Sequence, residues 1–479
     1  MVSIFNDVIG PVMRGASSSH CAAALRIGRL ARDLMGADIT HVLVEFDTAG
    51  SLPNTHTSQG SDMGLFGGLL GWDAADDRLP DSETALRSAG IGIDIRYADL
   101  KDPHPNTYRL TLTNPRERHT MIAISTGGGM IEVLEIDGQR VSLDGGAAVT
   151  IAGRTLNPVL PVLTYPDTRV PFSSCEELMR VAEGSDRRLW EWAVDYEMAR
   201  GRLSAGDVHA KMLEIVRILR RSIAQGIAGT TYADRVLGHQ SGAFEAAMQS
   251  GRLLDSGALT RAVLYTTALM EIKSSMGVIV AAPTAGACAA LPASVIGVAE
   301  EMNLTEDDMA RAMLAAGLIG VFIAQRWTFA AEVGGCQAEG GSAAAMAAAA
   351  LVTLANGTTS EATSASSMAL QSMLGLICDP VAARVEVPCL GKNVIAASNA
   401  MSCANMALAG FDQVIPFDEV VDAAKRVADA MPREHRCTAL GGLATTPTAV
   451  KLAGKLAERL RAQTRPAESH HPDRTTQGR

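Results

Sequence analysis

The chain has 479 residues, of which 47% are hydrophobic and 20% charged, and its formal net charge is −10 at pH 7. This length suffices for two or more domains, each with its own hydrophobic core. The acidic balance excludes a general nucleic-acid-binding protein, which would carry a basic face. Aromatic residues make up only 4% of the chain, and the abundant small side chains predict a tightly packed, largely helical body.

The first 150 residues mix helix and strand patterns. Residues 21–35 have apolar side chains at helical spacing. Five segments favour strands, several with alternating apolar and polar side chains: residues 41–47, 91–97, 107–113, 119–125 and 131–136. The sequence Asn114-Pro-Arg-Glu-Arg118 is typical of a hairpin loop. We therefore predict an α+β domain over residues 1–150.

Beyond residue 150 the pattern becomes helical. Four prolines predict a linker of limited flexibility over residues 151–172: Pro158, Pro161, Pro166 and Pro171. The larger, nearly all-α C-terminal domain is predicted over residues 173–464. Within it, Thr305-Glu-Asp-Asp308 opens a helix that runs to about Arg326, and Pro416-Phe-Asp-Glu419 opens another that ends near Met431. The polar residues 465–479 predict a disordered tail.

Two uncharged stretches, residues 276–299 and 340–360, raise the question of a membrane span. Both consist mainly of small residues and lack aromatic belts and basic flanks, so buried helices of a soluble domain are the better interpretation. The N-terminus shows no secretory signal, and the eight cysteines form no disulfide framework. We expect a protein of the reducing cytoplasm that does not bind membranes.

Three cysteines lie among glycine, proline and small residues: Cys336, Cys378 and Cys389. Thiolates hold iron–sulfur clusters, normally four per cubane, so three would leave one iron open to act as a Lewis acid. Taken alone, however, the pattern favours buried core thiols, because free cysteine is among the most buried residue types. Structural zinc is a weaker alternative, since the paired Cys-x2-Cys knuckles are absent.

Other motifs are open to two interpretations. Gly15-Ala-Ser-Ser-Ser-His20 offers hydroxyls and a helix N-terminus to a carboxylate, although ordinary N-capping explains it better on its own. Gln59-Gly-Ser-Asp62 and Ser125-Thr-Gly-Gly-Gly129 could bring backbone close to a ligand, but turns explain most such glycines. Pro283-Thr-Ala-Gly286 suits equally a helix break at a site and a bend in a buried helix. The P-loop and the dinucleotide-binding fingerprint are both absent.

In combination these motifs resemble the iron–sulfur-dependent L-serine dehydratases, which are pyridoxal-free lyases. The resemblance runs nearly end to end, from Ile9-Gly-Pro-Val-Met13 to Gly441-Gly-Leu-Ala-Thr-Thr-Pro-Thr448. The family's beta portion is matched by the Ser17-Ser-Ser-His20 and Ser125 motifs. Its alpha portion is matched by residues 280–286, 335–339, 378–381 and 387–389. Both portions lie on one chain.

The resemblance implies a [4Fe–4S] cluster held by Cys336, Cys378 and Cys389, and no pyridoxal phosphate. The fourth iron would activate the leaving hydroxyl in a β-elimination that converts L-serine, or a related β-substituted amino acid, to a 2-oxo acid and ammonia. The implied substrate-binding residues are Ser17, Ser18, Ser19, Gly60, Ser61, Asp62 and Asn393. His20 and Cys437 are the implied catalytic candidates. The expected partner is a small-molecule amino acid, and the expected assembly is a homodimer.

The chain departs from the family at five positions that the resemblance places near the site: Gln59 for a histidine, Lys273 for an asparagine, Ala382 and Ala383 for glycines, and Cys437 for a carboxylate. Glutamine has no titratable group and cannot carry a proton as a histidine would. These departures predict altered chemistry or an altered substrate. A homologue that acts on a modified or carrier-bound amino acid, or one that binds without turnover, are the alternatives.

Cys437 has several possible roles. It could occupy the fourth iron, or act as a base or nucleophile if Arg436 and His435 lower its pKa. A thiol that fills space is the plainer interpretation.

Overall fold

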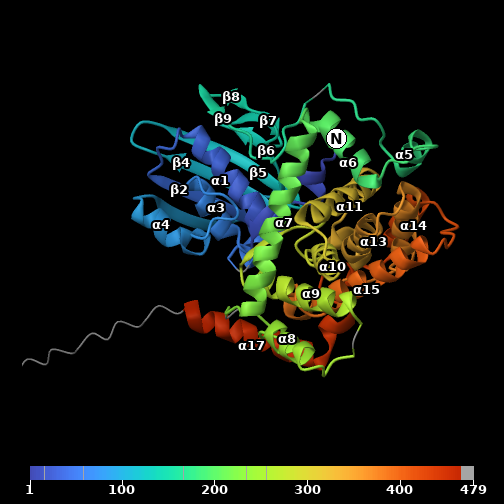
Figure 1. The fold of residues 1–479 in the computed structure, drawn as a ribbon. Coiled ribbons are helices and arrows are strands. Elements are labelled where there is room, and N and C mark those ends of the chain that lie inside the picture. Colours follow the sequence, from blue (N-terminus) through green and yellow to red (C-terminus); the bar gives the residue numbers. More distant parts are fainter. Residues whose placement is uncertain (16, 58, 166, 233–234, 255, 465–479) are drawn as a thin grey trace, which may run out of the picture.

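The structure is a computed structural model of the chain and describes residues 1–15, 17–57, 59–165, 167–232, 235–254 and 256–464. A sheet-containing N-terminal region lies beside a helical C-terminal region (Figure 1). This arrangement confirms the predicted order of the two regions. The predicted disordered tail, residues 465–479, lies outside the described residues.

The N-terminal sheet has six strands in the order β3-β2-β4-β5-β6-β7. Strands β2 and β3 run parallel, and the other neighbouring pairs are antiparallel. Alternate side chains of β4 are buried, namely Tyr108, Leu110 and Leu112, so the period-two pattern in the sequence faces the core. The strands are β2 (His41–Asp47), β3 (Gly92–Ala98), β4 (Thr107–Thr113), β5 (Arg118–Gly127), β6 (Met130–Ile136) and β7 (Gln139–Leu143). All five predicted strands are present.

Helices α1 (Ala23–Leu34) and α3 (Ser61–Leu69) share the core of the sheet and pack closely on each other. A side-chain carbon added to Gly68 would lie 2.2 Å from the Leu25 carbonyl oxygen, and one added to Gly28 would lie 2.4 Å from that of Leu65. The two backbones approach so closely that only glycine fits at the crossing. The shorter elements α2 (Leu52–Thr55) and α4 (Ser82–Ser88) and the hairpin β8 (Val149–Ile151) with β9 (Arg154–Leu156) complete this region.

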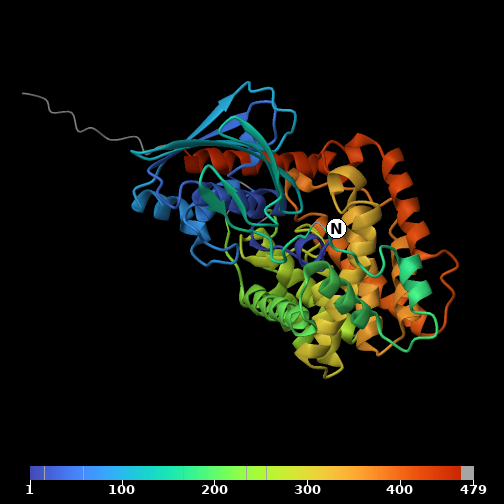
Figure 2. The ribbon, with the colours of Figure 1, turned by 90° about the horizontal axis from the view of Figure 1, so that it is seen from above.

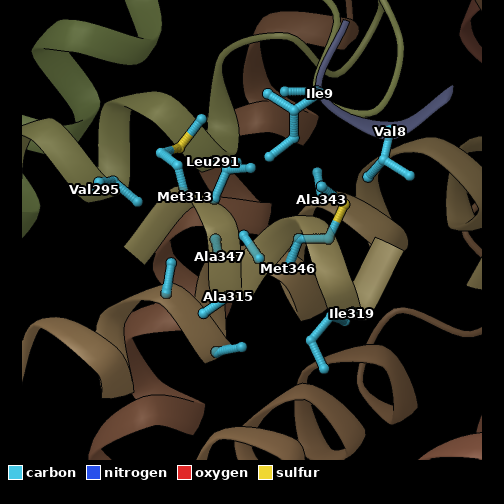
Figure 3. Packing of buried hydrophobic residues seen from close by; sticks show 14 of the residues in the cluster. Val8, Ile9, Leu291, Val295, Met313, Ala315, Ile319, Ala343, Met346 and Ala347 are labelled. Atoms are coloured by element: carbon cyan, nitrogen blue, oxygen red, sulfur yellow. The ribbon is translucent and has the colours of Figure 1, made fainter. Parts of the chain in front are cut away.

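The helical body surrounds α11 (Glu306–Arg326) and α13 (Ser342–Leu354). Helix α13 is rich in alanine and almost wholly buried, and its small side chains allow neighbouring helices to approach from several sides. Figure 3 shows Met346 and Ala347 of α13 packed among Met313 of α11 and Leu291 of α10 (Ala290–Glu301). The other helices are α5 (Cys175–Val181), α6 (Leu189–Gly201), α7 (Ala205–Ala228), α8 (Ser241–Gln249), α9 (Ala258–Ser274), α12 (Ala331–Gly334), α14 (Thr359–Gln371), α15 (Cys389–Leu408), α16 (Phe417–Ala430) and α17 (Pro447–Thr464).

Two of these helices test the predicted start signals. Helix α11 begins after Thr305, whose hydroxyl accepts from the Asp308 backbone N–H at 3.2 Å, while the Asp308 carboxylate accepts from the Thr305 N–H at 3.0 Å. This is the predicted capping box. Helix α16 follows Pro416 and ends at Ala430, which also confirms the prediction. Among the helices of the described residues, none is long and apolar enough to cross a membrane.

The first residues of the chain belong to the core of the helical body. A π-helical turn, Ile4–Val8, buries Ile4 and Val8 against Gly317 and Gly320 of α11. The Glu197 carboxylate accepts from the Ile4 backbone N–H at 2.9 Å. Strand β1 (Val12–Arg14) then pairs antiparallel with β10 (Val278–Val280). Figure 2 shows the N-terminus among the helices of the C-terminal region, so the two regions are joined by paired backbone as well as by the chain.

Candidate active site

Three cysteines that are far apart in the sequence meet in one small cluster. Cys336 and Cys378 are buried together, and Cys437 packs against them. Hydrogen bonding to the thiols of Cys336 and Cys437, together with burial, raises the pKa of the Cys378 thiol. Cys389 opens α15 and is also buried; burial raises the pKa of its thiol, and the nearby Cys336 adds to the effect. The structure therefore brings Cys437 into the group of predicted cluster cysteines.

The backbone holds Cys437 beside Cys378. The Cys378 N–H donates to the His435 carbonyl oxygen at 2.8 Å, and the Cys437 N–H donates to the Cys378 carbonyl oxygen at 3.1 Å. Asp379 fixes the same segment, because its carboxylate accepts from the Leu443 N–H at 2.9 Å. The two stretches of chain thus run side by side as a short parallel bridge.

Lys392 of α15 places a positive charge at this cluster. Its ammonium group lies 2.6 Å from a carboxylate oxygen of Asp379 and 3.6 Å from the Cys336 sulfur. A neighbouring cation favours the thiolate over the thiol. Lys392 therefore acts against the burial that raises the pKa of the Cys389 thiol.

Ala382 and Ala383, which stand where the family has glycines, lie near the cysteine group. Their backbone conformation is one that usually requires glycine. Ala382 and Ala383 both have φ of +54°, and Cys437 has φ of +60°. This left-handed region favours glycine, so Ala382 and Ala383 keep the conformation for which glycine would be the usual residue. Nothing in the structure explains why alanine stands there.

No group of three or more His, Cys, Asp or Glu side chains within the described residues is arranged to hold a metal ion. The donor set nevertheless has the chemistry of an iron–sulfur ligand group, because the thiols of Cys336, Cys378 and Cys437 pack together beside Lys392. The Cys389 thiol is near enough to Cys336 for the two to interact electrostatically. The thiol-rich composition of the site fits the cluster that the resemblance implies.

The Ser17-Ser-Ser-His20 motif forms a π-helical turn, Ser18–Ala22, ahead of α1. His20 is buried, with Nδ1 2.9 Å from the Ser17 hydroxyl and Nε2 3.0 Å from the Thr55 hydroxyl. Burial, and to a lesser extent the charge of His56, lower the pKa of His20 to about 4. His20 is therefore neutral at pH 7.

The neighbouring serines connect this turn to a second motif. The Ser17 and Ser19 hydroxyls lie 3.1 Å apart, and Ser18 is buried. The Ser125 hydroxyl donates to the Ser19 carbonyl oxygen at 2.7 Å. The start of the glycine-rich Ser125 motif therefore lies against the predicted carboxylate-binding turn.

The structure reveals a histidine that the sequence analysis missed. Nδ1 of His56 lies 2.7 and 2.8 Å from the two carboxylate oxygens of Asp62, and Nε2 lies 2.7 Å from the Tyr97 hydroxyl. His56 stands three residues before Gln59, in the same loop as the missing family histidine. A histidine so close to Asp62 in the sequence was the signal that could have identified it.

The other predicted residues of this loop have defined positions. Gly60 has φ of +88° and precedes α3. The Ser61 hydroxyl is buried and accepts from the Tyr108 hydroxyl at 3.0 Å. Asp62 faces His56. The loop thus joins the sheet to α3 through buried polar contacts.

Asn393 of α15 ties a second loop to the cysteine group. Its Oδ1 accepts from the N–H groups of Ala289 and Ala290, at 3.3 and 3.1 Å. Its Nδ2 donates to the carbonyl oxygens of Gly286 and Cys389, both at 2.9 Å. All these partners are backbone groups, so Asn393 fixes the 284–290 segment at the start of α15.

The two predicted parts of the site are linked through α9 and β10. The Gly15 N–H donates to the Gly277 carbonyl oxygen at 3.4 Å, which sets the residues before Ser17 beside the end of α9. Lys273, on the last turn of α9, is buried and donates to the Val385 carbonyl oxygen. The positive charge of Lys273 acts to lower the pKa of the Cys389 thiol. Lys273 therefore lies between the N-terminal motif and the cysteine group.

Comparison with known proteins agrees with this organisation. A family model for the serine dehydratase alpha chain matches residues 185–444. A probable L-serine dehydratase alpha chain of Bacillus subtilis is 36% identical over 285 residues, which cover 60% of this chain and 95% of that protein. The chain belongs to the L-serine dehydratase family.

This family assignment extends over both regions. A probable L-serine dehydratase beta chain of Bacillus subtilis is 41% identical over 143 residues, covering 30% of this chain and 64% of that protein. The L-serine dehydratase of Streptomyces coelicolor is 28% identical over 475 residues, covering 92% of this chain and 97% of that protein. The beta and alpha portions of an L-serine dehydratase are therefore fused in this chain, as predicted. L-Serine dehydratases are lyases.

Proposed function

We propose that this protein catalyses β-elimination of L-serine or a related β-substituted amino acid, with release of a 2-oxo acid and ammonia. The observation that carries the proposal is the meeting of the Cys336, Cys378 and Cys437 thiols beside Lys392. The relatives named above are serine dehydratases, which supports the reaction class.

The proposed cofactor is a [4Fe–4S] cluster held by Cys336, Cys378 and Cys389, without pyridoxal phosphate. Such a cluster, when bound, supplies a Lewis acid that stabilises the charge developing on the leaving oxygen. Lys392 places its ammonium group 3.6 Å from the Cys336 sulfur. Cys437, in contact with Cys378, is the further sulfur available at this site.

The N-terminal motif is proposed to bind the substrate carboxylate. Ser17 and Ser19 offer hydroxyls, and the turn that contains Ser18 offers backbone N–H groups at the start of a helical segment. His20 is held neutral and oriented by Ser17 and Thr55. A neutral imidazole orders these hydroxyls without adding charge.

The substrate is proposed to differ from free L-serine. Gln59 cannot carry a proton, and Lys273 adds a buried ammonium group near the cysteines. A modified or carrier-bound amino acid fits this altered environment, and we expect free L-serine to react weakly. His56, paired with Asp62, returns an imidazole to the loop that has lost its usual histidine. The proposed assembly is a homodimer in the cytoplasm.

The proposal is tested with protein purified anaerobically. We expect about one [4Fe–4S] cluster per chain from iron and sulfide analysis. Replacing Cys336, Cys378 or Cys389 by serine should remove the brown chromophore while the far-UV circular dichroism stays unchanged. A colourless protein that contains zinc and almost no iron would refute the cofactor assignment.

The substrate is tested with a panel of β-substituted amino acids assayed for 2-oxo acid. We expect at least one of them to give a higher kcat/KM than L-serine, and Gln59→His to raise the activity on L-serine. Efficient deamination of L-serine, with no better substrate in the panel, would contradict the proposed specificity.

A further inference from the structure

The elimination requires a base that removes the α-proton, and His20 and Cys437 are the candidates that the resemblance implies. We propose that Glu339 is the catalytic base that takes this proton. The inference rests on the proposed function, because it assigns a role in the same reaction.

The turn that follows Cys336 presents Glu339 to the site. This π-helical turn, Gln337–Gly341, buries every residue except Glu339, which keeps part of its surface open. One carboxylate oxygen, Oε1, accepts from the Thr284 hydroxyl at 2.8 Å. Within the described part of the chain, Oε2 has no hydrogen-bond partner. The side chain is thus anchored at one oxygen and free at the other.

Gly286 makes room for this carboxylate. A side-chain carbon at position 286 would lie 2.9 Å from both oxygens of Glu339. Asn393 holds the Gly286 carbonyl and the Cys389 carbonyl through the same amide nitrogen. Glu339 therefore lies beside Gly286, and Asn393 links Gly286 to Cys389 at the start of α15.

The charges around Glu339 suit a base that works near neutral pH. Burial, and after it the like charge of Glu332 on α12, raise the pKa of Glu339 to about 7. The Thr284 hydrogen bond and the ammonium groups of Lys273 on α9 and Lys392 on α15 act in the opposite direction. The negative charge of Glu339 in turn raises the pKa values of the Cys288 and Cys389 thiols. A catalytic base is most effective when its pKa lies near the working pH.

The other candidate bases near the site already contact protein groups. The Cys437 thiol is hydrogen-bonded to Cys378. Both ring nitrogens of His20 and of His56 contact protein side chains. Lys273 donates to a backbone carbonyl. The free oxygen of Glu339 is better placed to accept a proton from a bound molecule.

The proposed step balances as follows. The substrate Cα–H bond breaks, and its proton passes to Oε2 of Glu339. The electron pair left on Cα forms the Cα–Cβ double bond as the Cβ–O bond breaks, and the oxygen leaves with the electrons of that bond. The protonated carboxyl then returns its proton to the departing hydroxide, which gives water and a 2-aminoacrylate and restores the glutamate.

The test compares Glu339→Gln with wild type as the anaerobic holoenzyme, using the best substrate of the panel. Glutamine keeps the size of the side chain and an acceptor for Thr284. We expect kcat to fall by about 100-fold or more, the usual contribution of a general base. The iron and sulfide content and the calorimetric Kd for the substrate should stay within about twofold of the wild-type values. A change of that size is small beside the expected loss of kcat. Glu214→Gln, at an exposed glutamate on α7 away from this site, is the matched control and should keep wild-type kcat.

A second variant guards against loss of the cofactor in the first. Glu339→Asp keeps the charge but withdraws it from the substrate. We expect a lower kcat and a larger primary isotope effect with α-deuterated substrate, because proton removal becomes rate-limiting. A structural role for Glu339 would leave the isotope effect unchanged.

The outcomes separate the two proposals. Wild-type kcat in Glu339→Gln, or an unchanged kcat and isotope effect in Glu339→Asp, would overturn the assignment of the base and leave the lyase function standing. A cluster-loaded wild-type protein with no activity on any member of the panel would overturn the proposed function, and this assignment with it.

Discussion

Replacing Gly68 by alanine tests whether the contact between α1 and α3 positions the N-terminal motif. The added carbon would lie 2.2 Å from the Leu25 carbonyl oxygen and 2.9 Å from the Arg29 nitrogen, whereas ordinary contacts begin at 3.4 Å. Both obstacles are helix backbone, which cannot rotate away as a side chain can. The helices must therefore separate by about 1 Å, the scale of strain that costs a well-packed core typically 1–3 kcal/mol.

The displacement should also reduce activity. Helix α1 follows the turn that contains His20, and α3 follows Gly60, so a separation of these helices moves the two motifs apart. We expect a lower urea midpoint and a kcat/KM reduced by more than the loss of folded protein explains. A misplacement of about 1 Å can cost 100-fold in rate.

Gly454→Ala is the matched control. Gly454 lies within α17, is exposed, and has open space around an added carbon. Alanine is favoured over glycine in a helix interior by roughly 0.5–1 kcal/mol, so this variant should be as stable as wild type or slightly more so. Equal urea midpoints and equal activities for Gly68→Ala and wild type would refute the account of the helix crossing.

Two further predictions concern His20 and Cys437. Because burial and then the charge of His56 lower the pKa of His20 to about 4, the unfolded chain takes up a proton below about pH 6.5 that the folded chain refuses. Stability should therefore fall as the pH falls from about 6.5 toward 4, by roughly 2 kcal/mol at pH 5. Urea unfolding at pH 7 and pH 5 should show a smaller difference in His20→Gln than in wild type, and equal differences would contradict this. Anaerobic Cys437→Ser should alter the electron paramagnetic resonance spectrum of the reduced cluster, whereas Cys403→Ser should not. Unchanged spectra and activity in both would show that Cys437 only fills space.

Much of the fold could be predicted because its signals are local. The alternation in residues 107–113 and the capping box at Thr305 depend on neighbouring residues alone, and the structure has both. Strand β7 was not predicted, although Asp137 and Gly138 both adopt positive φ in the tight turn before it. A short strand of mainly exposed side chains gives too weak a pattern to detect.

The parts that escaped prediction depend on contacts between distant residues. Nothing near Ile4 in the sequence indicates that it packs on Gly317. The meeting of Cys378 with Cys437 is set by backbone pairing after the chain has folded back on itself. Glu339 lies within a motif that was identified for its cysteine, but its partner Thr284 is brought to it only by the tertiary structure.

The burial of the N-terminal segment has a consequence for synthesis on the ribosome. The residues Ile4–Val8 are synthesised long before the helices against which they pack, which are complete only when α13 ends at Leu354. Domains commonly fold in the order in which they are translated, but here the apolar turn Ile4–Val8 lacks its packing partners until α13 has been made. The sheet can form early, whereas its seating on the helical body must wait. In a polypeptide that stops before Leu354, the apolar side chains of this turn would remain exposed to solvent. Chaperones could then bind them, or they could promote aggregation.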